Sequence, residues 1–129
     1  MAEANCIATA AVFIVADLKK STEWYIERLG FVAAKLDWGE RPAFSVIRCD
    51  GASIMLKQGD KKSLANRHYT PGDVVADAYF WVRDLKKIEL LLKVGDTPIF
   101  AGPVKRAYGC TEIMVIDPDD YLICFGRCP

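Results

Sequence analysis

The chain has 129 residues, of which 52% are hydrophobic and 26% are charged. This length suits one domain built on a single core, so we predict one domain over residues 1–129. Lys and Arg together number 17, as do Asp and Glu, so the chain has no net charge to attract nucleic acid or an anionic membrane. No apolar run approaches the roughly 18 residues of a membrane-spanning helix. We therefore predict neither a nucleic-acid partner nor a membrane partner.

A repeated segment divides the chain into two halves. Residues 11–20 read AVFIVADLKK and residues 78–87 read AYFWVRDLKK, with most positions identical and in register. In both copies a strand-like run ends at Asp-Leu, and a helix-like run begins there. A repeat on this scale decides the architecture. It predicts an α+β fold of two βαβββ modules, residues 7–58 and 74–127, joined by a connection over residues 59–73.

The first half has clear helix and strand signals. Asp17 can cap an amphipathic helix whose apolar residues recur at helical spacing, and Gly30 can end that helix. Asp50 and Gly51 are typical of a hairpin turn. The elements expected here, in chain order, are a strand over 7–16, a helix over 18–29, and strands over 31–38, 43–49 and 53–58.

The second half repeats this order after a polar connection that could form a flap. Asp84 precedes the predicted helix, Gly95 follows it, and a turn is expected over residues 117–120. The elements expected here are a strand over 74–82, a helix over 85–94, and strands over 99–105, 110–116 and 121–126.

Strand alternation separates two faces in each repeated strand. One face is nearly identical in the two copies, and the following helix should pack on it. The other face differs, which is typical of a ligand surface or an interface. The matching triplets are Ala11, Phe13, Val15 and Ala78, Phe80, Val82; the differing triplets are Ala10, Val12, Ile14 and Asp77, Tyr79, Trp81.

The cysteines form no recognisable metal or redox motif. The chain has five cysteines and one histidine, His68, with no pair of cysteines at CxxC spacing. Cys124 and Cys128 are too far apart for a disulfide if the strand between them is extended. We therefore expect reduced, mostly buried thiols in a cytoplasmic protein. The cysteines are Cys6, Cys49, Cys110, Cys124 and Cys128.

Two segments resemble known motifs. Residues 13–31, FIVADLKKSTEWYIERLGF, and residues 108–125, YGCTEIMVIDPDDYLICF, resemble the opening and closing signatures of the vicinal oxygen chelate superfamily. That superfamily includes glyoxalase I, bleomycin resistance protein and the extradiol dioxygenases. The resemblance implies paired βαβββ modules that form a cleft walled by a curved sheet, usually in a dimer.

The same resemblance bears on metal binding. It places the four metal-ligand positions of the superfamily's enzymes on Ala10, Met55, Asp77 and Cys124. Alanine and methionine cannot hold a divalent metal through oxygen or nitrogen, and the other two make a poor site. His68 lies in the connection, outside this pattern. A metal-dependent enzyme is therefore disfavoured, and we expect no metal and no other cofactor.

The favoured function is metal-independent binding of a small molecule, as in bleomycin-resistance-like proteins, by a homodimer. The ligand would be apolar or aromatic with polar ends. Asp77 and Arg48 would bind those ends, although each could instead be structural or solvated. Glu112, at the superfamily's acidic position, is better explained by a structural hydrogen bond. The predicted ligand-binding residues are Trp38, Phe44, Arg48, Met55, Asp77, Tyr79, Trp81 and Tyr108.

Two alternatives stay open. One is a glyoxalase-like lyase or isomerase, or a dioxygenase-related enzyme, with a non-standard site. The other is a dimeric interaction protein whose cleft is filled by its own side chains. In that case Tyr79 and Trp81 would pack at an interface, a role that suits aromatic rings with a polar tip.

Overall fold

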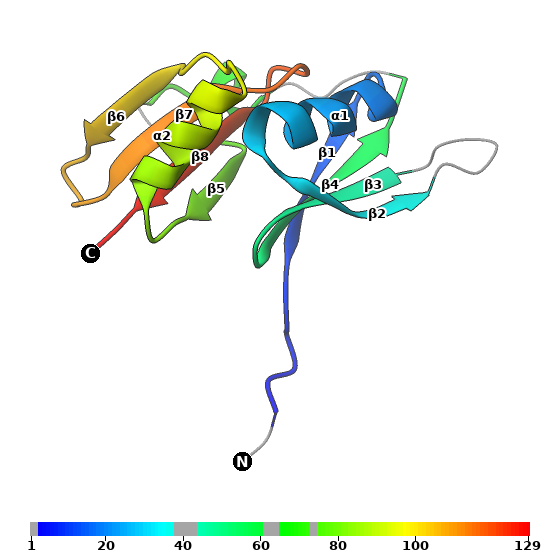
Figure 1. Cartoon of the computed structure of the whole chain (residues 1–129), viewed down its shortest axis with the longest axis horizontal. Helices are drawn as coiled ribbons and strands as arrows, with labels where there is room; N and C mark the ends of the chain where they lie inside the picture. The colour runs from blue at the N-terminus through cyan, green and yellow to red at the C-terminus, as the bar shows by residue number, and fades with distance from the viewer. Residues whose placement is uncertain (1–2, 38–43, 61–64, 73–74) are drawn as a thin grey trace.

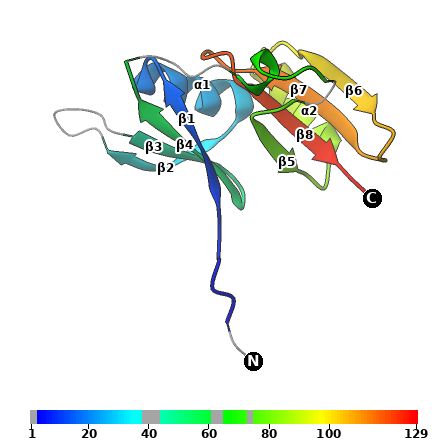
Figure 2. The ribbon, with the colours of Figure 1, turned by 180° about the vertical axis from the view of Figure 1, so that it is seen from behind.

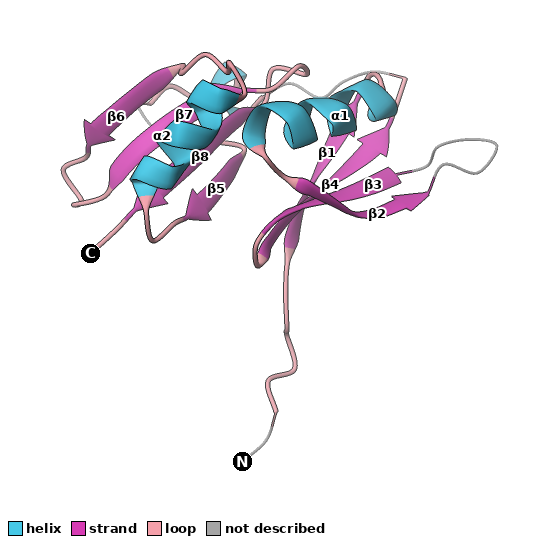
Figure 3. Ribbon diagram, viewed as in Figure 1, coloured by secondary structure: helices cyan, strands magenta, loops and turns pink. Residues whose placement is uncertain are grey.

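The computed structural model describes residues 3–37, 44–60, 65–72 and 75–129. These residues form two helices, eight strands and one short 3-10 helix, and Figures 1 and 3 label the helices α1 and α2 and the strands. In chain order they are β1 (Ala10–Val15), α1 (Leu18–Leu29), β2 (Val32–Asp37), β3 (Phe44–Cys49), β4 (Ala52–Gln58), η1 (Asn66–His68), β5 (Ala78–Trp81), α2 (Leu85–Val94), β6 (Ala101–Lys105), β7 (Thr111–Ile116) and β8 (Leu122–Arg127).

The strands form two mixed sheets with the same topology. The first sheet has the order β1-β4-β3-β2 and the second β5-β8-β7-β6. In each sheet the first and last strands of the module pair in parallel, and the other neighbours are antiparallel. The predicted α+β fold of two βαβββ modules is therefore confirmed (Figure 3).

Both helices begin at an aspartate, as the sequence predicts. The Asp17 side chain accepts a hydrogen bond from the Lys20 backbone N–H at 3.1 Å, and Asp84 accepts one from Lys86 at 3.0 Å. Such a cap satisfies one of the unpaired N–H groups of the first turn and contributes about 1 kcal/mol. Gly30, with φ 70°, ends α1 in the left-handed conformation that glycine adopts without strain.

The two helices pack on matching faces of their sheets. Phe13, Val15 and Phe80, from the faces that the repeat keeps identical, are between 0% and 6% exposed. The helices lie on the same side of the two sheets, as Figures 1 and 2 show from opposite directions. The Arg28 guanidinium at the end of α1 donates to the backbone carbonyl of Gly95 at 3.0 Å, so the helix ends also meet.

The turn between β7 and β8 joins the second module to the first. Asp119 accepts hydrogen bonds from the Ala16 backbone N–H at 2.9 Å and from the Ser21 hydroxyl at 2.7 Å. Tyr25, which is fully buried in α1, donates to the Asp117 carboxylate at 2.6 Å. These contacts fix the position of one module against the other, because both carboxylates are themselves buried.

Several details differ from the sequence predictions. The predicted first and fifth strands begin too early: residues 3–9 are an exposed extended segment that leaves the body of the protein, and residues 75–77 precede β5 (Figure 1). Both segments are apolar enough to read as strand. Among the described residues no strand pairs with residues 3–9, and the second segment makes one backbone hydrogen bond to β8, from the Asp77 N–H to the Leu122 carbonyl at 2.8 Å. No helix among the described residues has the length and apolar character needed to span a membrane.

The cysteine prediction is wrong for two of the five residues. Cys110 and Cys128 form a disulfide that ties the start of β7 to the C-terminal end of β8. Because β7 and β8 are antiparallel, residues 18 apart in sequence meet across the hairpin. Sequence spacing alone does not show this pairing. The other three cysteines are free, and of these only Cys124 is buried.

Candidate functional site

A groove lies between the first strands of the two modules. It has a volume of about 470 Å³ and is lined by residues 8–11, 51–53 and 77–81. We call it the strand groove. It brings together Ala10, Asp77, Tyr79 and Trp81, four of the positions that the sequence singles out.

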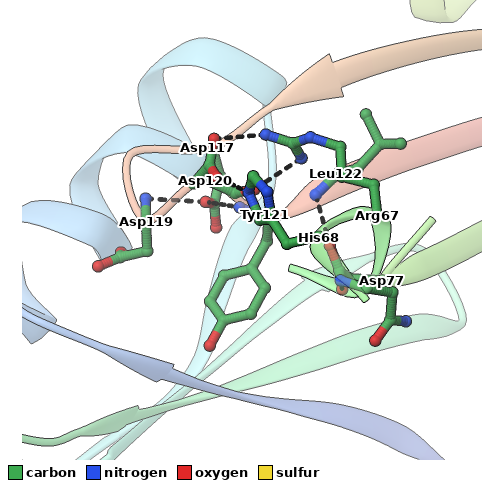
Figure 4. A network of polar contacts seen from close by, with 9 residues as sticks. Arg67, His68, Asp77, Asp117, Asp119, Asp120, Tyr121 and Leu122 are labelled. Atoms are coloured by element: carbon green, nitrogen blue, oxygen red, sulfur yellow. Dashed lines mark hydrogen bonds and ion pairs between the residues drawn. The ribbon is translucent and has the colours of Figure 1, made fainter. Parts of the chain in front are cut away.

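Asp77 is held by two backbone groups at one end of this groove. Its carboxylate accepts a hydrogen bond from the Asn66 N–H at 2.8 Å and one from the Leu122 N–H at 2.7 Å (Figure 4). The two bonds use different oxygens of the carboxylate. Asp77 therefore links η1 to β8, and each oxygen keeps only part of its accepting capacity for a ligand.

The segment that holds η1 carries a second anchor, which the sequence analysis missed. Asp120 forms an ion pair with Arg67 at 2.5 Å and a hydrogen bond with His68 Nε2 at 2.5 Å (Figure 4). The hydrogen bond from His68, followed by that from Arg67, lowers the pKa of Asp120. Ala65, just before η1, is fully buried. The chain between the modules is thus fastened to the β7–β8 turn, a pairing that no local sequence signal indicates.

The positions that hold a metal in the superfamily's enzymes do not suit one here. Ala10 lines the groove but has no side-chain atom that could bind a metal, and Met55, which pairs with Val12 on the same sheet, has only a thioether and does not line the groove. Burial, and then the nearby Glu112, raise the pKa of Cys124 to about 12, which disfavours the thiolate that would bind a metal. No group of three or more His, Cys, Asp or Glu residues in the described part of the chain could hold a metal ion.

A buried carboxylate organises the aromatic side of the site. Glu112 is fully buried on β7, and it accepts hydrogen bonds from the Tyr79 hydroxyl at 2.6 Å, the Tyr108 hydroxyl at 2.5 Å and Arg106 Nε at 2.9 Å. The structural hydrogen-bonding role predicted for Glu112 is therefore present. Gly126 makes this possible, because a Cβ there would overlap the Tyr79 hydroxyl.

The electrostatics of this cluster keep Glu112 ionised. Burial favours the neutral acid, but the hydrogen bonds from Tyr108, Tyr79 and Arg106 outweigh it and lower the pKa of Glu112. Burial of the hydroxyl and the bond to Glu112 raise the pKa of Tyr108 to about 12. The same causes raise the pKa of Tyr79. Both phenols therefore stay protonated and act as hydrogen-bond donors, which holds their rings in place.

Trp81 is the most exposed aromatic residue beside the groove. It is 76% exposed, and its ring centroid lies 5.1 Å from that of Tyr79. The Glu112 cluster fixes Tyr79, so the tryptophan stands against an ordered neighbour. A large exposed ring on an ordered support can stack on a planar ligand or pack at an interface.

The remaining predicted residues lie on the helix-free face of the first sheet. There Phe44 pairs with Lys57, Val46 pairs with Met55, and Arg48 donates from Nε to the Ser53 hydroxyl at 3.3 Å. Next to them, Val12 and Val32 are 57% and 60% exposed, so this face presents apolar side chains to solvent.

The structure thus separates the predicted site into two groups. Tyr79, Trp81 and Asp77 line the strand groove, and Tyr108 joins them through Glu112. The first-sheet group does not line that groove. It consists of Phe44, Arg48 and Met55. Trp38 lies outside the described residues.

Comparisons with known proteins bear on the fold. No protein-family profile matches the sequence, and no curated protein matches it. Solved structures do. TioX from Micromonospora sp. ML1 is similar at a TM-score of 0.72 and 14% identity, over 95% of this chain and 98% of that one. TnmS3, an antibiotic binding protein from Streptomyces sp. CB03234, is similar at a TM-score of 0.63 and 20% identity, over 95% of this chain and 98% of that one.

A third similar structure carries the superfamily's name. It is a glyoxalase/bleomycin resistance protein/dioxygenase from Alicyclobacillus acidocaldarius, with a TM-score of 0.69 and 18% identity, over 94% of this chain and 90% of that one. At these identities the likeness concerns the fold, and it extends over nearly the whole of each chain. The chain therefore has the fold of the glyoxalase/bleomycin resistance protein/dioxygenase proteins, as the sequence motifs predict.

Proposed function

We propose that this protein binds and sequesters a small molecule without a metal ion, at a site that includes the strand groove. The observation that carries the proposal is the groove itself, about 470 Å³, with the exposed Trp81 and the anchored Tyr79 along one wall. Ligand sites are typically apolar hollows of this size with a few fixed polar groups. Asp77 supplies such a polar group, and the rings of Tyr79 and Trp81 suit an aromatic ligand.

A homodimer would complete the site. The helix-free face of the first sheet exposes Val12 and Val32, and the extended segment before β1 exposes Ile7 at 90%. Apolar surface of this kind is typical of an interface. A second copy placed over it would bring Phe44, Arg48 and Met55 opposite the groove of its partner. This arrangement unites the two groups of predicted residues around one ligand.

The fold neighbours give this proposal a class of ligand to try first. TnmS3 is an antibiotic binding protein with the same fold. Aromatic antibiotics are therefore the first compounds to screen by equilibrium dialysis. The alternative of an enzyme is less favoured, because alanine and methionine at two ligand positions leave only Asp77 and a high-pKa Cys124 as donors.

The test is a binding screen with paired variants. Trp81→Ala should weaken binding of any compound that the wild type retains by about fivefold or more, since stacking on an aromatic ring contributes about 1–3 kcal/mol. Val94→Ala is the matched control, because Val94 is also highly exposed, at 78%, but lies at the end of α2. Equal affinity of both variants for a bound compound would contradict the site, and absence of any bound aromatic compound would contradict the function.

The oligomeric state has its own measurement. Sedimentation equilibrium should show a dimer for the wild type and mostly monomer for Val12→Asp, because a carboxylate in an apolar interface is costly to desolvate. A wild-type monomer at all concentrations would leave the site open on one side and contradict the dimeric arrangement.

The predicted cytoplasmic location stays a prediction. The Cys110–Cys128 bond argues against it, because disulfides persist mainly in oxidising compartments. Alkylation of the protein in intact cells, followed by mass spectrometry, distinguishes a reducing compartment from an oxidising one. Modified Cys110 and Cys128 support the cytoplasm, and unmodified ones contradict it.

A further inference from the structure

The strand groove lies between two sheet edges. β1 and β5 are each an outermost strand of their sheet, and they lie next to each other where the two modules meet (Figures 1 and 2). The groove is lined there by consecutive residues, 8–11 and 77–81. Side chains of consecutive strand residues point to opposite faces, so a wall of consecutive residues is the edge of a strand. Such an edge presents backbone N–H and C=O groups.

The hydrogen bonds of β1 show which of its backbone groups point to this edge. The Val15 carbonyl points to β4, because it accepts from the Gly59 N–H at 3.1 Å, and Gly59 directly follows β4. The Ile14 carbonyl points the other way and accepts from the Tyr121 hydroxyl of the second module at 2.8 Å. Backbone groups of successive residues in a parallel pair alternate between the two edges. The even-numbered residues of β1 therefore present their N–H and C=O groups to the edge that faces the second module.

One end of this edge is covered and the other is open. The Asp119 carboxylate accepts from the Ala16 N–H at 2.9 Å, so the turn between β7 and β8 covers the end of the edge. Ala10 and Val12 lie toward the other end, and no hydrogen bond within the described residues reaches their outward N–H and C=O groups. Both residues are exposed, Val12 at 57%, and Ala10 lines the strand groove. The open end of the edge is therefore the end that the groove contains.

An open strand edge inside a groove suits an extended chain. Its unpaired N–H and C=O groups are matched by another strand at a separation of about 4.8 Å. β5 forms the opposite wall, so a single extended chain can enter, whereas the edge of a folded sheet would bring its second strand onto β5. Paired strands match residue for residue, so the open edge from residue 8 to residue 12 takes a chain of about five residues. These features favour a short peptide over a second copy of the folded chain.

We propose that the strand groove binds an extended peptide of about five residues, which pairs with the open edge of β1 and adds a strand to the first sheet. The inference rests on the proposed function and deepens it, because it names the class of ligand. Main-chain hydrogen bonds to Ala10 and Val12 supply affinity. Side chains on the helix-free side of the peptide lie beside the rings of Tyr79 and Trp81, which favours aromatic and β-branched residues there.

Amide hydrogen exchange of the wild type, followed by NMR, is the direct test. The probe is the blocked peptide acetyl-Lys-Val-Tyr-Val-Thr-amide, whose β-branched and aromatic residues favour an extended strand. In the free protein the amides of Ala10 and Val12 should exchange fast, and those of Ala11 and Phe13, which face β4, should exchange slowly. At a peptide concentration of about nine times Kd, occupancy predicts approximately tenfold slower exchange at Ala10 and Val12 and no change at Ala11 and Phe13.

Two outcomes of the exchange measurement overturn the proposal. One is fast exchange at Ala10 and Val12 when the peptide is present in excess. The other is slow exchange at both amides without peptide that becomes fast on dilution, because it would assign the open edge to a second copy of the chain.

Two ester analogues of the peptide separate backbone pairing from side-chain binding. In one, ester oxygens replace the N–H groups of the second and fourth residues, and in the other those of the third and fifth, with all side chains unchanged. Alternate N–H groups of an extended peptide point to the same edge, so only one analogue loses the donors that face β1. Its affinity, measured by titration calorimetry, should be at least about fivefold lower than that of the other analogue. Equal affinities overturn the proposal.

Ala10→Pro removes one donor from the open edge. Proline is tolerated at the first residue of a strand, and Ala10 is the first residue of β1 and does not donate to β4. The variant should bind the peptide about fivefold more weakly than the wild type. Ala10→Val is the matched control, because it enlarges the side chain and keeps the N–H, and it should bind like the wild type. Equal affinity of the two variants overturns the proposal, and the exchange test on the wild type decides it if Ala10→Pro does not fold.

The failure of this inference is distinguishable from that of the proposed function. An aromatic compound that binds in a manner sensitive to Trp81→Ala, together with a peptide that does not bind, contradicts the inference and leaves the proposed function untouched. If neither the peptide nor any aromatic compound binds, both are contradicted.

Discussion

The centre of the helix-free face of the second sheet is covered, with Trp81 exposed at its edge, whereas that of the first sheet is open. On the second sheet, Met114 and Cys124 are 1% and 0% exposed and pack against Ala76. On the first sheet, Val12 and Val32 are 57% and 60% exposed. The opposite faces of the same strands are alike, since both bury aromatic and branched side chains under a helix. The duplicated scaffold thus keeps one face constant and lets the other change.

Residues at corresponding positions show how the helix-free faces of the two sheets differ. Tyr79 pairs with Cys124 on the second sheet where Val12 pairs with Met55 on the first. Glu112 stands where the first sheet has Phe44. Glu112 pairs with Gly126, two residues after Cys124, and Phe44 pairs with Lys57, two residues after Met55. A polar, hydrogen-bonded cluster on one face therefore replaces an apolar surface on the other. That contrast is what the following changes test.

The largest effect is expected at Glu112. Glu112→Ala should lower the free energy of unfolding by about 3–5 kcal/mol, because it removes the buried partner of Arg106 and of two tyrosine hydroxyls. Urea denaturation measures it. Phe44→Ala, on the open face, should cost less. A larger loss for Phe44→Ala than for Glu112→Ala would reverse the comparison of the two faces.

A smaller, pH-dependent effect is expected at Asp117. Burial raises the pKa of Asp117 from 3.8 to about 6. The folded state therefore favours the neutral acid, and the stability from this group is full at low pH and is lost as pH rises through the folded pKa. Between pH 3.8 and about 6, the contribution of Asp117 to the free energy of unfolding should fall by about 3 kcal/mol.

Denaturation of the wild type and Asp117→Asn at several pH values isolates this contribution. The stability difference between them should shift against the wild type between pH 3.8 and about 6. Tyr25→Phe should extend the shift to higher pH, because it removes a hydrogen bond that favours the carboxylate. A difference that does not change with pH would show that Asp117 has the same pKa in the folded and unfolded states, which contradicts a pKa raised by burial.

The smallest effect is expected at Ala52, which lines a pocket of about 630 Å³ between the β3–β4 turn and α2. Ala52→Tyr should raise the free energy of unfolding by about 1 kcal/mol, since filling a pocket next to Phe80 adds apolar burial. Thermal unfolding followed by circular dichroism measures the change. Tyr121→Ala is the reciprocal variant, because Tyr121 stands at the corresponding place after the β7–β8 turn and its ring stacks on Phe13, and it should be destabilising. If Ala52→Tyr destabilises the protein, the surroundings of the two turns differ in shape.

Much of the fold could be predicted because it depends on local signals. Hydrophobic periodicity and the caps at Asp17 and Asp84 gave both helices with correct bounds, and the repeat gave the topology of both sheets. The strand ends were less accurate at residues 7–9, since apolar composition does not tell whether a partner strand is present. The motifs near both ends of the chain also identified the fold.

The site was predictable only in part. Alternation placed Tyr79 and Trp81 on the face away from the helix, and the groove beside them agrees with that orientation. The partners of Asp77 and Asp120 come from residues 11 and 53 positions away, so no pattern in the sequence connects them. The same is true of the Cys110–Cys128 bond, which depends on the register of two strands.

The sequence by itself determined the repeated βαβββ order and the faces that pack under the helices. These depend on residue type and on short-range spacing. Only the tertiary structure decided which helix-free face is covered, how the β7–β8 turn joins the two modules and how Glu112 holds two tyrosines. Those features depend on contacts between distant residues, and strand register and the docking of one module on the other bring these residues together.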